Sequence, residues 1–508
     1  MKKTKISTVL ALVIGSSWAL PAYADDATST STTSATSTAA ASSALPASGA
    51  TSPGQPVTGG THTGLTAPGP TPHTVNAIVN EEAKQNGQTA AALSSQAKSK
   101  GFLADSHLGL VLRNYADYAE IHGTGHRHAW VQSAMLNYES GFTRGLVGFG
   151  VDASLYGAFK LDGGLGAGNM VHVAKSGNGA NQLAWGYPGV FDVKARVSET
   201  VVKYGEMQIT DNPLMEGHDN RSLPPTFRGV MVTSNEFKNL SLEAGSFDGV
   251  RTRGTDYVQK LSTSYGGTTF DRLTYIGGNW KYAKDGTLSL YADQAENVWK
   301  QYYGSLTQSL GDVKKVKWTG VATAYSTHGD GSNLQGSINN NAYSVSLAAQ
   351  HGFSEILLAY QKILGNQFFD YVAQTNGIYL ANSMDMDYNA PHEQSLQLRY
   401  TFYGDQAGIP GFKTMVWALQ GWGADSSAEA AANAATTATY HDLYWDNGSY
   451  IHGRHHEFGI MPTYTVQNGR MKGTKVSAFF AWHVGSAYYS DTTSKEFRLV
   501  VNMPFSFF

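Results

Sequence analysis

Residues 497–508 read Phe497-Arg-Leu-Val-Val-Asn-Met-Pro-Phe-Ser-Phe-Phe508 and close the chain. Large apolar side chains occupy the odd-numbered positions, whereas Arg498, Asn502 and Ser506 share the even-numbered ones. This two-residue period predicts a β-strand with one apolar face. Many similar segments and few helix-forming runs precede it, so lipid is the simplest solvent for that face. Because a bilayer cannot hydrogen-bond backbone groups, a strand that faces lipid must belong to a closed barrel.

The first 24 residues have the composition of a secretory signal peptide. Lysines precede an apolar run at 9–20, and Pro21-Ala-Tyr-Ala24 provides an A-x-A cleavage site. The run is too short for a transmembrane helix, and no later segment offers the roughly 18–20 consecutive apolar residues that such a helix needs. We therefore expect the mature protein to start near Asp25 and to reside in the outer membrane.

Two segments separate the signal peptide from the barrel. Residues 25–74 consist mainly of Ser, Thr, Ala, Gly and Pro and cannot bury enough apolar surface to fold. Residues 75–100 have a weak helical periodicity that Gly87 interrupts, which permits a short helix or a tether. A plug or a cell-wall-binding element is the alternative for this segment.

Residues 101–508 carry the two-residue period and form the predicted barrel. It is plainest at 147–161, where apolar residues alternate with small or polar ones. Lys284-Asp-Gly286 and Gln467-Asn-Gly469 predict tight periplasmic turns, and the polar stretches 327–341 and 424–441 predict extracellular loops. A strand and its connection use roughly 20–25 residues, so these residues supply about 16–20 strands. A barrel of this size encloses an aqueous lumen, which implies transport.

Composition and motifs point away from other classes of protein. The chain has no Cys and a net charge of -3, so thiolate metal sites and the basic excess of a nucleic-acid binder are both missing. The glycines of 145–150 continue into a strand rather than a helix, so they do not form a phosphate loop. His455 and His456 are adjacent and should point to opposite faces of a strand, which disfavours a metal site. No G-x-S-x-G elbow follows a strand, and we predict no enzyme, metal or cofactor.

The sequence resembles the OprD family of outer-membrane porins along the whole predicted barrel. The motifs that carry the resemblance include Gly101-Phe-Leu-Ala-Asp-Ser106, Leu112-Arg-Asn-Tyr115, Leu223-Pro-Pro-Thr-Phe-Arg-Gly229, Phe369-Asp-Tyr371, Leu380-Ala-Asn-Ser383, His455-His-Glu457 and Glu496-Phe-Arg-Leu499. The resemblance implies an all-β, closed antiparallel barrel, most simply of 18 strands. It also implies that loops fold inward and narrow the lumen, and that a row of basic residues lines it.

Carried over position by position, the resemblance suggests residues along the solute path. The basic row is represented by Arg113, Arg196, Lys203, Arg399 and Arg498. The segment 380–387 is similar to the family's constriction loop and places Ser383 and Asp387 at the constriction, with Tyr371 as a further wall residue. Where carboxylate-selective members carry additional arginines, this chain has Trp417, Ser477 and Phe479. If their register holds, Trp417 and Phe479 lie on the lumen side, where aromatic faces could guide sugars. The segments 467–473 and 503–508 are also similar to chitoporins of the same family.

These observations predict an outer-membrane porin through which small water-soluble solutes diffuse passively. Its partners are then the lipid of the outer membrane and small polar solutes. Amino acids, small carboxylates and short sugars all remain open as solutes, and the protein could act as a monomer or a homotrimer. The alternative is an adhesin or cell-wall anchor that binds through residues 25–100 and uses the barrel as a mount.

Overall fold

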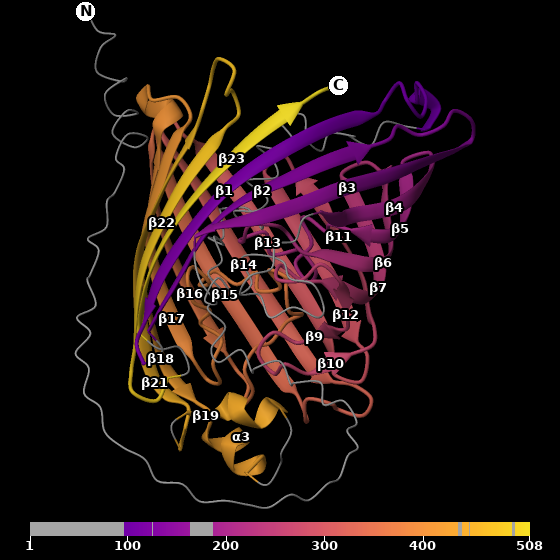
Figure 1. Ribbon diagram of the computed structural model, residues 1–508. Coiled ribbons are helices and arrows are strands. Elements are labelled where there is room, and N and C mark those ends of the chain that lie inside the picture. Colours follow the sequence, from indigo (N-terminus) through magenta and orange to yellow (C-terminus); the bar gives the residue numbers. More distant parts are fainter. Residues whose placement is uncertain (1–95, 124, 163–185, 435–438, 447, 490–492) are drawn as a thin grey trace, which may run out of the picture. The chain divides into compact units, whose positions relative to one another are not determined.

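The computed structural model describes residues 96–508 except 124, 163–185, 435–438, 447 and 490–492. Within them, eighteen long antiparallel strands form a closed barrel (Figure 1). Closure occurs at β1 (His107–Ile121), which pairs with β2 (Gly125–Glu139) on one side and with β23 (Ser494–Ser506) on the other. The remaining barrel strands are β3 (Val147–Asp162), β4 (Tyr187–Val197), β5 (Thr200–Met207), β6 (Thr226–Phe237), β7 (Leu240–Arg251), β11 (Leu273–Ala283), β12 (Gly286–Ala295), β13 (Trp299–Asp312), β14 (Val316–Gly329), β15 (Asn339–His351), β16 (Ser354–Ile363), β17 (Gln394–Tyr403), β18 (Phe412–Asp425), β21 (His452–Thr465) and β22 (Lys475–Gly485).

The 3-10 turn η1 (Gln96–Lys98) precedes β1. Other short elements occupy the connections between barrel strands. They are the 3-10 turns η3 (Gly404–Ala407) and η4 (Thr439–Tyr444), the helix α3 (Ser427–Ala432), and the short strands β8 (Val258–Gln259), β9 (Leu261–Ser262), β10 (Thr269–Phe270), β19 (Trp445–Asp446) and β20 (Ser449–Tyr450). In the part of the chain that the structure describes, no helix is both long enough and apolar enough to cross a bilayer.

The alternation along the strands matches the predicted two-faced pattern. On β3, Leu155 and Phe159 are 55% and 47% exposed on the outer face, whereas Asp152 and Tyr156 are buried inside. On β23, Phe497 is exposed and Arg498 is fully buried. The predicted polar face of each strand therefore points into the lumen, and the predicted closed barrel of 18 strands is confirmed.

The two ends of the barrel differ. Near one end, which we call the turn end, the amide of Leu108 donates to the carbonyl of Phe508 and that of Gln96 to the carbonyl of Ser198 in the β4–β5 turn. Helix α3 lies at the opposite end, which we call the loop end (Figure 1). Since barrels of this class have short periplasmic turns and longer extracellular loops, the turn end is periplasmic.

Some predicted connections need correction. Lys284 and Asp285 form the expected two-residue turn between β11 and β12, but Gln467-Asn-Gly469 belongs to a longer connection, 466–474, between β21 and β22. The strands that flank the first predicted loop extend further than expected, so this loop occupies 330–338 rather than 327–341. The second loop occupies 426–451 rather than 424–441, because β18 extends to Asp425 and β21 begins only at His452. Polar residues at these strand ends face solvent or the lumen, which the sequence pattern alone cannot distinguish from loop residues.

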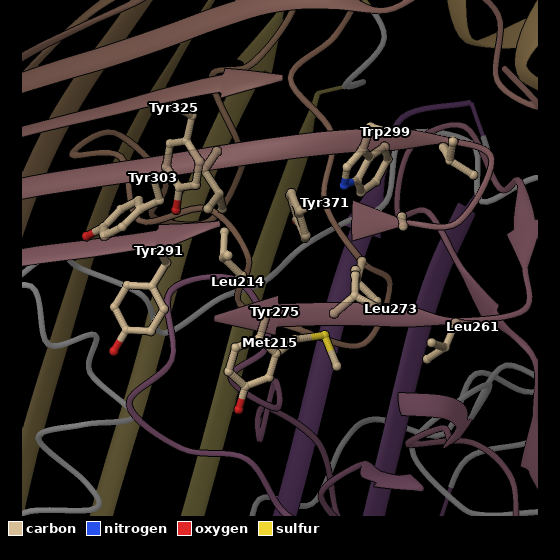
Figure 2. Packing of buried hydrophobic residues seen from close by; sticks show 14 of the residues in the cluster. Leu214, Met215, Leu261, Leu273, Tyr275, Tyr291, Trp299, Tyr303, Tyr325 and Tyr371 are labelled. Carbon is tan, nitrogen blue, oxygen red and sulfur yellow. The ribbon is translucent and has the colours of Figure 1, made fainter. Parts of the chain in front are cut away.

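Three connections from the loop end fold into the barrel. Numbering the connections at that end in chain order, they are L3 (208–225), L4 (252–272) and L7 (364–393). They share a buried apolar cluster with the inner wall, in which Leu214 of L3 and Tyr371 of L7 pack near Tyr291, Tyr303 and Tyr325 of the strands (Figure 2). The Tyr303 and Tyr325 ring centroids are 4.9 Å apart. Burial of this apolar surface holds the loops against the wall and narrows the lumen.

The signal peptide and the segments 25–74 and 75–95 lie outside the described residues. The described residues 96–100 contain a single 3-10 turn, η1. The predicted tether, helix or anchor in the N-terminal extension therefore stays a prediction.

Candidate functional site: the constricted lumen

L3 is fastened to the inner wall of the barrel by Arg113 on β1. The Arg113 guanidinium binds Asp219 of L3 in a bidentate manner, with N–O distances of 2.5 and 2.8 Å. It also donates to the carbonyl oxygen of Arg221 at 2.8 Å, and its Nε donates to Asn502 at 2.7 Å. The hydroxyl of Tyr115 adds a hydrogen bond to the Asn220 carbonyl. Arg113 lies on the lumen side, as predicted, but it serves mainly to hold L3 in place.

L3 and L7 meet in the middle of the barrel. Gly217 and Thr375 form an isolated antiparallel bridge, and the hydroxyl of Tyr379 donates to Glu216 at 2.6 Å. Because L7 is attached to the far wall, this contact makes one continuous partition from β1 across the lumen.

The three residues predicted at the constriction form a single hydrogen-bonded cluster. Asp387 accepts the hydroxyl of Tyr371 at 2.7 Å on one carboxylate oxygen and the hydroxyl of Ser383 on the other. Tyr265 of L4 donates to the same oxygen as Tyr371, at 2.9 Å. Burial, together with the adjacent Asp387 carboxylate, raises the pKa of Tyr371 well above its usual value, so this phenol remains a donor. The cluster joins L4 to L7.

Asp370, which the sequence analysis did not single out, organises the same region. Its carboxylate accepts backbone N–H groups from Ser264, Tyr265, Gly266 and Tyr371 and the side-chain amide of Gln335. Burial raises the pKa of Asp370, although these hydrogen bonds act in the opposite direction. Its position within the quoted Phe369-Asp-Tyr371 motif was the signal that could have identified it.

The inner wall opposite L3 carries a row of cationic and aromatic side chains on neighbouring strands. Arg399 on β17 is the register partner of Trp417 on β18, and Phe479 on β22 is that of Arg498 on β23. The Trp417 and Phe479 rings lie 5.6 Å apart, and the Arg498 guanidinium lies 5.0 Å from the Phe479 ring. The predicted lumen side of all four residues agrees with their burial.

The aromatic pair is covered by L7 and is not an open wall. Trp417 and Phe479 are 1% and 3% exposed, and they share a buried cluster with Met384 and Tyr388 of L7. The Trp417 indole N–H donates to Glu457 at 2.5 Å. Glu457 also accepts the backbone N–H groups of 385 and 386 in L7. The role of these two rings in guiding sugars stays a prediction. The alternation of the strand places a side chain in the lumen but does not say what covers it.

This architecture, a strand-closed barrel with inward loops, agrees with the comparisons. A family model described as "outer membrane porin, OprD family" matches residues 100–507. The chain belongs to the OprD family. It is similar to Porin D of Pseudomonas aeruginosa, at 34% identity over 430 residues that cover 82% of this chain and 94% of that protein. The OprD-family channel described here is thus a non-enzymatic porin of the outer membrane that passes small solutes.

Solved structures from Pseudomonas aeruginosa resemble the OprD-family channel closely. OccD3 (OpdP) superposes with a TM-score of 0.70 at 34% identity, and the match covers 82% of this chain and 95% of that one. OpdK with vanillate gives a TM-score of 0.69 at 28% identity, with 80% and 100% covered.

Two other basic residues of the OprD-family channel lie nearer its periplasmic end. Lys203 on β5 contacts Asp152 at 2.6 Å and Asp192 at 3.9 Å, and it lines a cavity of about 370 Å³ beneath L3. Arg196 on β4 lies over the Phe142 ring at 4.2 Å and donates to the buried side chain of Gln96. Both point inward, but each already has a partner within the protein.

Arg399 differs from the other members of the basic row. It is 2% exposed, and neither its Nε nor its Nη1 has a hydrogen-bond partner among the described residues. Glu355 attracts it electrostatically without coming within ion-pair distance. Arg498, by contrast, forms an ion pair with Glu496 and lies 3.8 Å from Asp117. Buried polar groups are normally satisfied, so the unsatisfied N–H groups of Arg399 mark it as an exception.

We expect Arg113→Ala to release L3 from the wall of the OprD-family channel. Removing the charge-assisted bonds to Asp219 should lower the free energy of unfolding by about 1–3 kcal/mol. Hydrogen exchange across L3 measures the release directly. Arg228→Ala is the matched control, since the ion pair of Arg228 with Asp248 is exposed and should contribute at most about 1 kcal/mol. Equal protection of L3 in both variants would contradict this role.

A buried acid and two histidines close L7 against the wall of the OprD-family channel. Glu393 and His455 are joined at 2.7 Å, and His455 meets His483 at 2.7 Å through its other ring nitrogen. The hydroxyl of Tyr489, from L9 (486–493), donates to Glu393 at 2.8 Å. The rings of Tyr388 and Tyr489 stack on His455 at 3.9 and 4.0 Å. The predicted opposite orientations of His455 and His456 are confirmed, because His455 is buried and His456 is exposed.

We expect this attachment of L7 to weaken at alkaline pH. Burial raises the pKa of Glu393 to about 8, against the lowering effect of Tyr489 and the Ala390 amide. The folded protein therefore holds this proton more tightly than the unfolded chain, in which the carboxyl has its usual pKa of 4.5. The resulting stabilisation is complete below pH 4.5 and is lost as the pH rises through about 8. Hydrogen exchange at 390–393, corrected for its intrinsic pH dependence, should accelerate between about pH 7 and 9, and Glu393→Gln should remove that acceleration.

Proposed function

We propose that this porin prefers zwitterionic solutes of amino-acid size over simple carboxylate anions and over short sugars. The observation that carries this proposal is the pairing of charges along the lumen. Arg399 retains unsatisfied N–H groups, whereas Arg113, Lys203 and Arg498 each contact a carboxylate of the protein.

A simple anion meets a lumen in which most cations are already neutralised. To bind at Arg113 or Lys203 it must compete with Asp219 or Asp152. A zwitterion can instead direct its carboxylate to Arg399 and its ammonium group to the carboxylates of the same lumen.

The covered aromatic pair argues against a sugar path. Sugars are held by aromatic faces beside polar groups, but Trp417 and Phe479 are buried in a cluster that includes Met384 and Tyr388. The relative OpdK was crystallised with vanillate, which is a carboxylate. The discrimination must therefore be measured on this protein.

Single-channel recording in a planar bilayer tests the proposal with arginine, benzoate and chitotriose added in turn. We expect arginine to interrupt the current at lower concentration than benzoate, and chitotriose to have little effect. Arg399→Gln should raise the arginine concentration needed by about tenfold, the loss of one charge-assisted contact. Arg228→Gln, which removes the same charge outside the lumen, should change nothing. Preferential block by benzoate would assign the channel to carboxylates, and block by chitotriose would assign it to sugars.

A further inference from the structure

A groove on the outer face of the barrel lies at the extracellular end, between β18, β21 and L9. Its volume is about 480 Å³, and it is lined by Trp422, Gly423, His452, Gly453, Arg454 and residues 486–488. The neighbouring residues Gly421 and His455 are buried on the lumen side, so Trp422 and Arg454 point away from the lumen. The groove therefore cannot serve the solute path.

Arg454 provides an exposed positive charge within this groove. Its side chain has no ion pair or hydrogen bond with any described residue, although its backbone N–H donates to Ser486. Three other exposed cations towards the loop end are paired: Arg228 with Asp248, Lys260 with Asp271, and Lys300 with Asp330. An arginine without a carboxylate partner, placed beside aromatic rings, is suited to a planar or tetrahedral anion.

Aromatic side chains form the walls around Arg454. Trp422 is its register partner on β18 and is 37% exposed. The His452 ring stacks with Tyr488 at a centroid distance of 5.1 Å and lies tilted against Tyr450 at 4.6 Å. Faces of this kind pack against sugar rings and apolar chains, while the tips of Tyr and Trp can hydrogen-bond at a membrane–water boundary.

The groove continues directly into the lipid-facing surface. Further along β21, Phe458 and Ile460 are 46% and 37% exposed on the same outward face, and Trp482 on the neighbouring β22 is 47% exposed. We call this lipid-facing surface of β21 and β22 the apolar belt. A molecule that fills the groove and extends along the apolar belt must have both a polar part and an apolar part. The occupant is thus a membrane lipid, and the extracellular position of the groove places it in the outer leaflet.

We propose that this groove binds the phosphorylated sugar headgroup of an outer-leaflet glycolipid of the lipid A class. Arg454 contacts a phosphate, Trp422 and Tyr488 pack against the sugar, and the acyl chains follow the apolar belt of β21 and β22. The inference depends on the position of the barrel in the membrane and is independent of the solute that the lumen prefers.

Native mass spectrometry of the purified full-length protein in detergent tests the proposal, with bisphosphorylated lipid A as the probe. We expect Arg454→Gln to weaken lipid A binding about tenfold, the loss of a charge-assisted phosphate contact. Arg228→Gln should bind as the unaltered protein does, since it removes the same charge from an exposed position elsewhere on the outer face. Dephosphorylated lipid A should bind the unaltered protein as weakly as lipid A binds Arg454→Gln.

Several outcomes would overturn the proposal. Equal binding of lipid A by Arg454→Gln and Arg228→Gln would show that Arg454 is not part of the site. Equal binding of lipid A and dephosphorylated lipid A by the unaltered protein would show that the phosphate is not recognised. Displacement of lipid A by millimolar inorganic phosphate would indicate a site for free anions instead. Heat-dependent gel mobility and unchanged conductance establish that each variant is folded. If Arg454→Gln does not fold, Arg454→Lys replaces it, and its loss of the bidentate contact should still weaken binding measurably.

Discussion

Replacing Trp417 by alanine is expected to destabilise the folded barrel by about 3–5 kcal/mol, the usual cost of removing a large buried aromatic side chain. Trp417 is among the largest fully buried side chains. It fills the space over Gly459, where a Cβ atom would lie 2.0 Å from the indole ring. Its loss also leaves Glu457, which holds the backbone of 385 and 386, without its indole donor. Both effects should detach L7 from β21.

Equilibrium unfolding in urea, with the protein in detergent micelles, gives the stability change for Trp417→Ala. Trp417→Phe is the informative control, because it keeps much of the packing but removes the N–H donor. We expect Trp417→Phe to be less stable than the unaltered protein and more stable than Trp417→Ala. The protection of L7 from hydrogen exchange should follow the same order. If Trp417→Ala leaves the exchange of 384–388 unchanged, then Trp417 does not position this loop.

Shortening L7 is expected to enlarge the channel more than any single substitution. Replacing 368–389 by a short Gly-Ser linker removes the part of the loop that contacts β13, β14, β15, β16 and β21 through hydrogen bonds. The strands remain paired, because the barrel ladder does not use L7. An 18-stranded barrel without such a plug encloses an open aqueous channel, so single-channel conductance should rise several-fold.

The shortened protein should also lose its discrimination between arginine and benzoate. Tyr303, Tyr325 and the other wall residues of the buried cluster become exposed to water, so we expect a lower melting temperature as well. Heat-dependent gel mobility distinguishes a closed barrel from an unfolded one. Unchanged conductance from a closed, shortened barrel would show that L7 does not form the constriction.

The comparison of Arg498 with Trp417 shows how far the sequence pattern reaches. The two-residue period of their strands placed both side chains on the lumen side, and both are buried there. The pattern did not reveal that Glu496 pairs with Arg498 or that Met384 and Tyr388 cover Trp417. The face on which a side chain lies follows from local backbone geometry. Its contacts with other residues depend on how the strands and L7 come together.

The residues of the constriction also show what the sequence could predict and what it could not. The family motifs brought Tyr371, Ser383 and Asp387 together correctly, since all three belong to one loop. Asp219, which holds L3 to Arg113, was missed because 106 residues separate the two. Gln96 and Arg196 are likewise separated by 100 residues. No periodic signal marks a polar loop residue whose partner lies on a distant strand.

The sequence by itself determined the closed barrel, its lipid-facing and lumen-facing residues, and the family to which the chain belongs. These properties follow from a two-residue period and from short motifs, both of which are local along the chain. Only the tertiary structure decided which lumen cations are already paired, which aromatic rings are covered, and which arginine keeps unsatisfied N–H groups. Those features depend on loops that fold back across the barrel, and their positions are set by the burial and hydrogen bonding of residues far apart in the sequence.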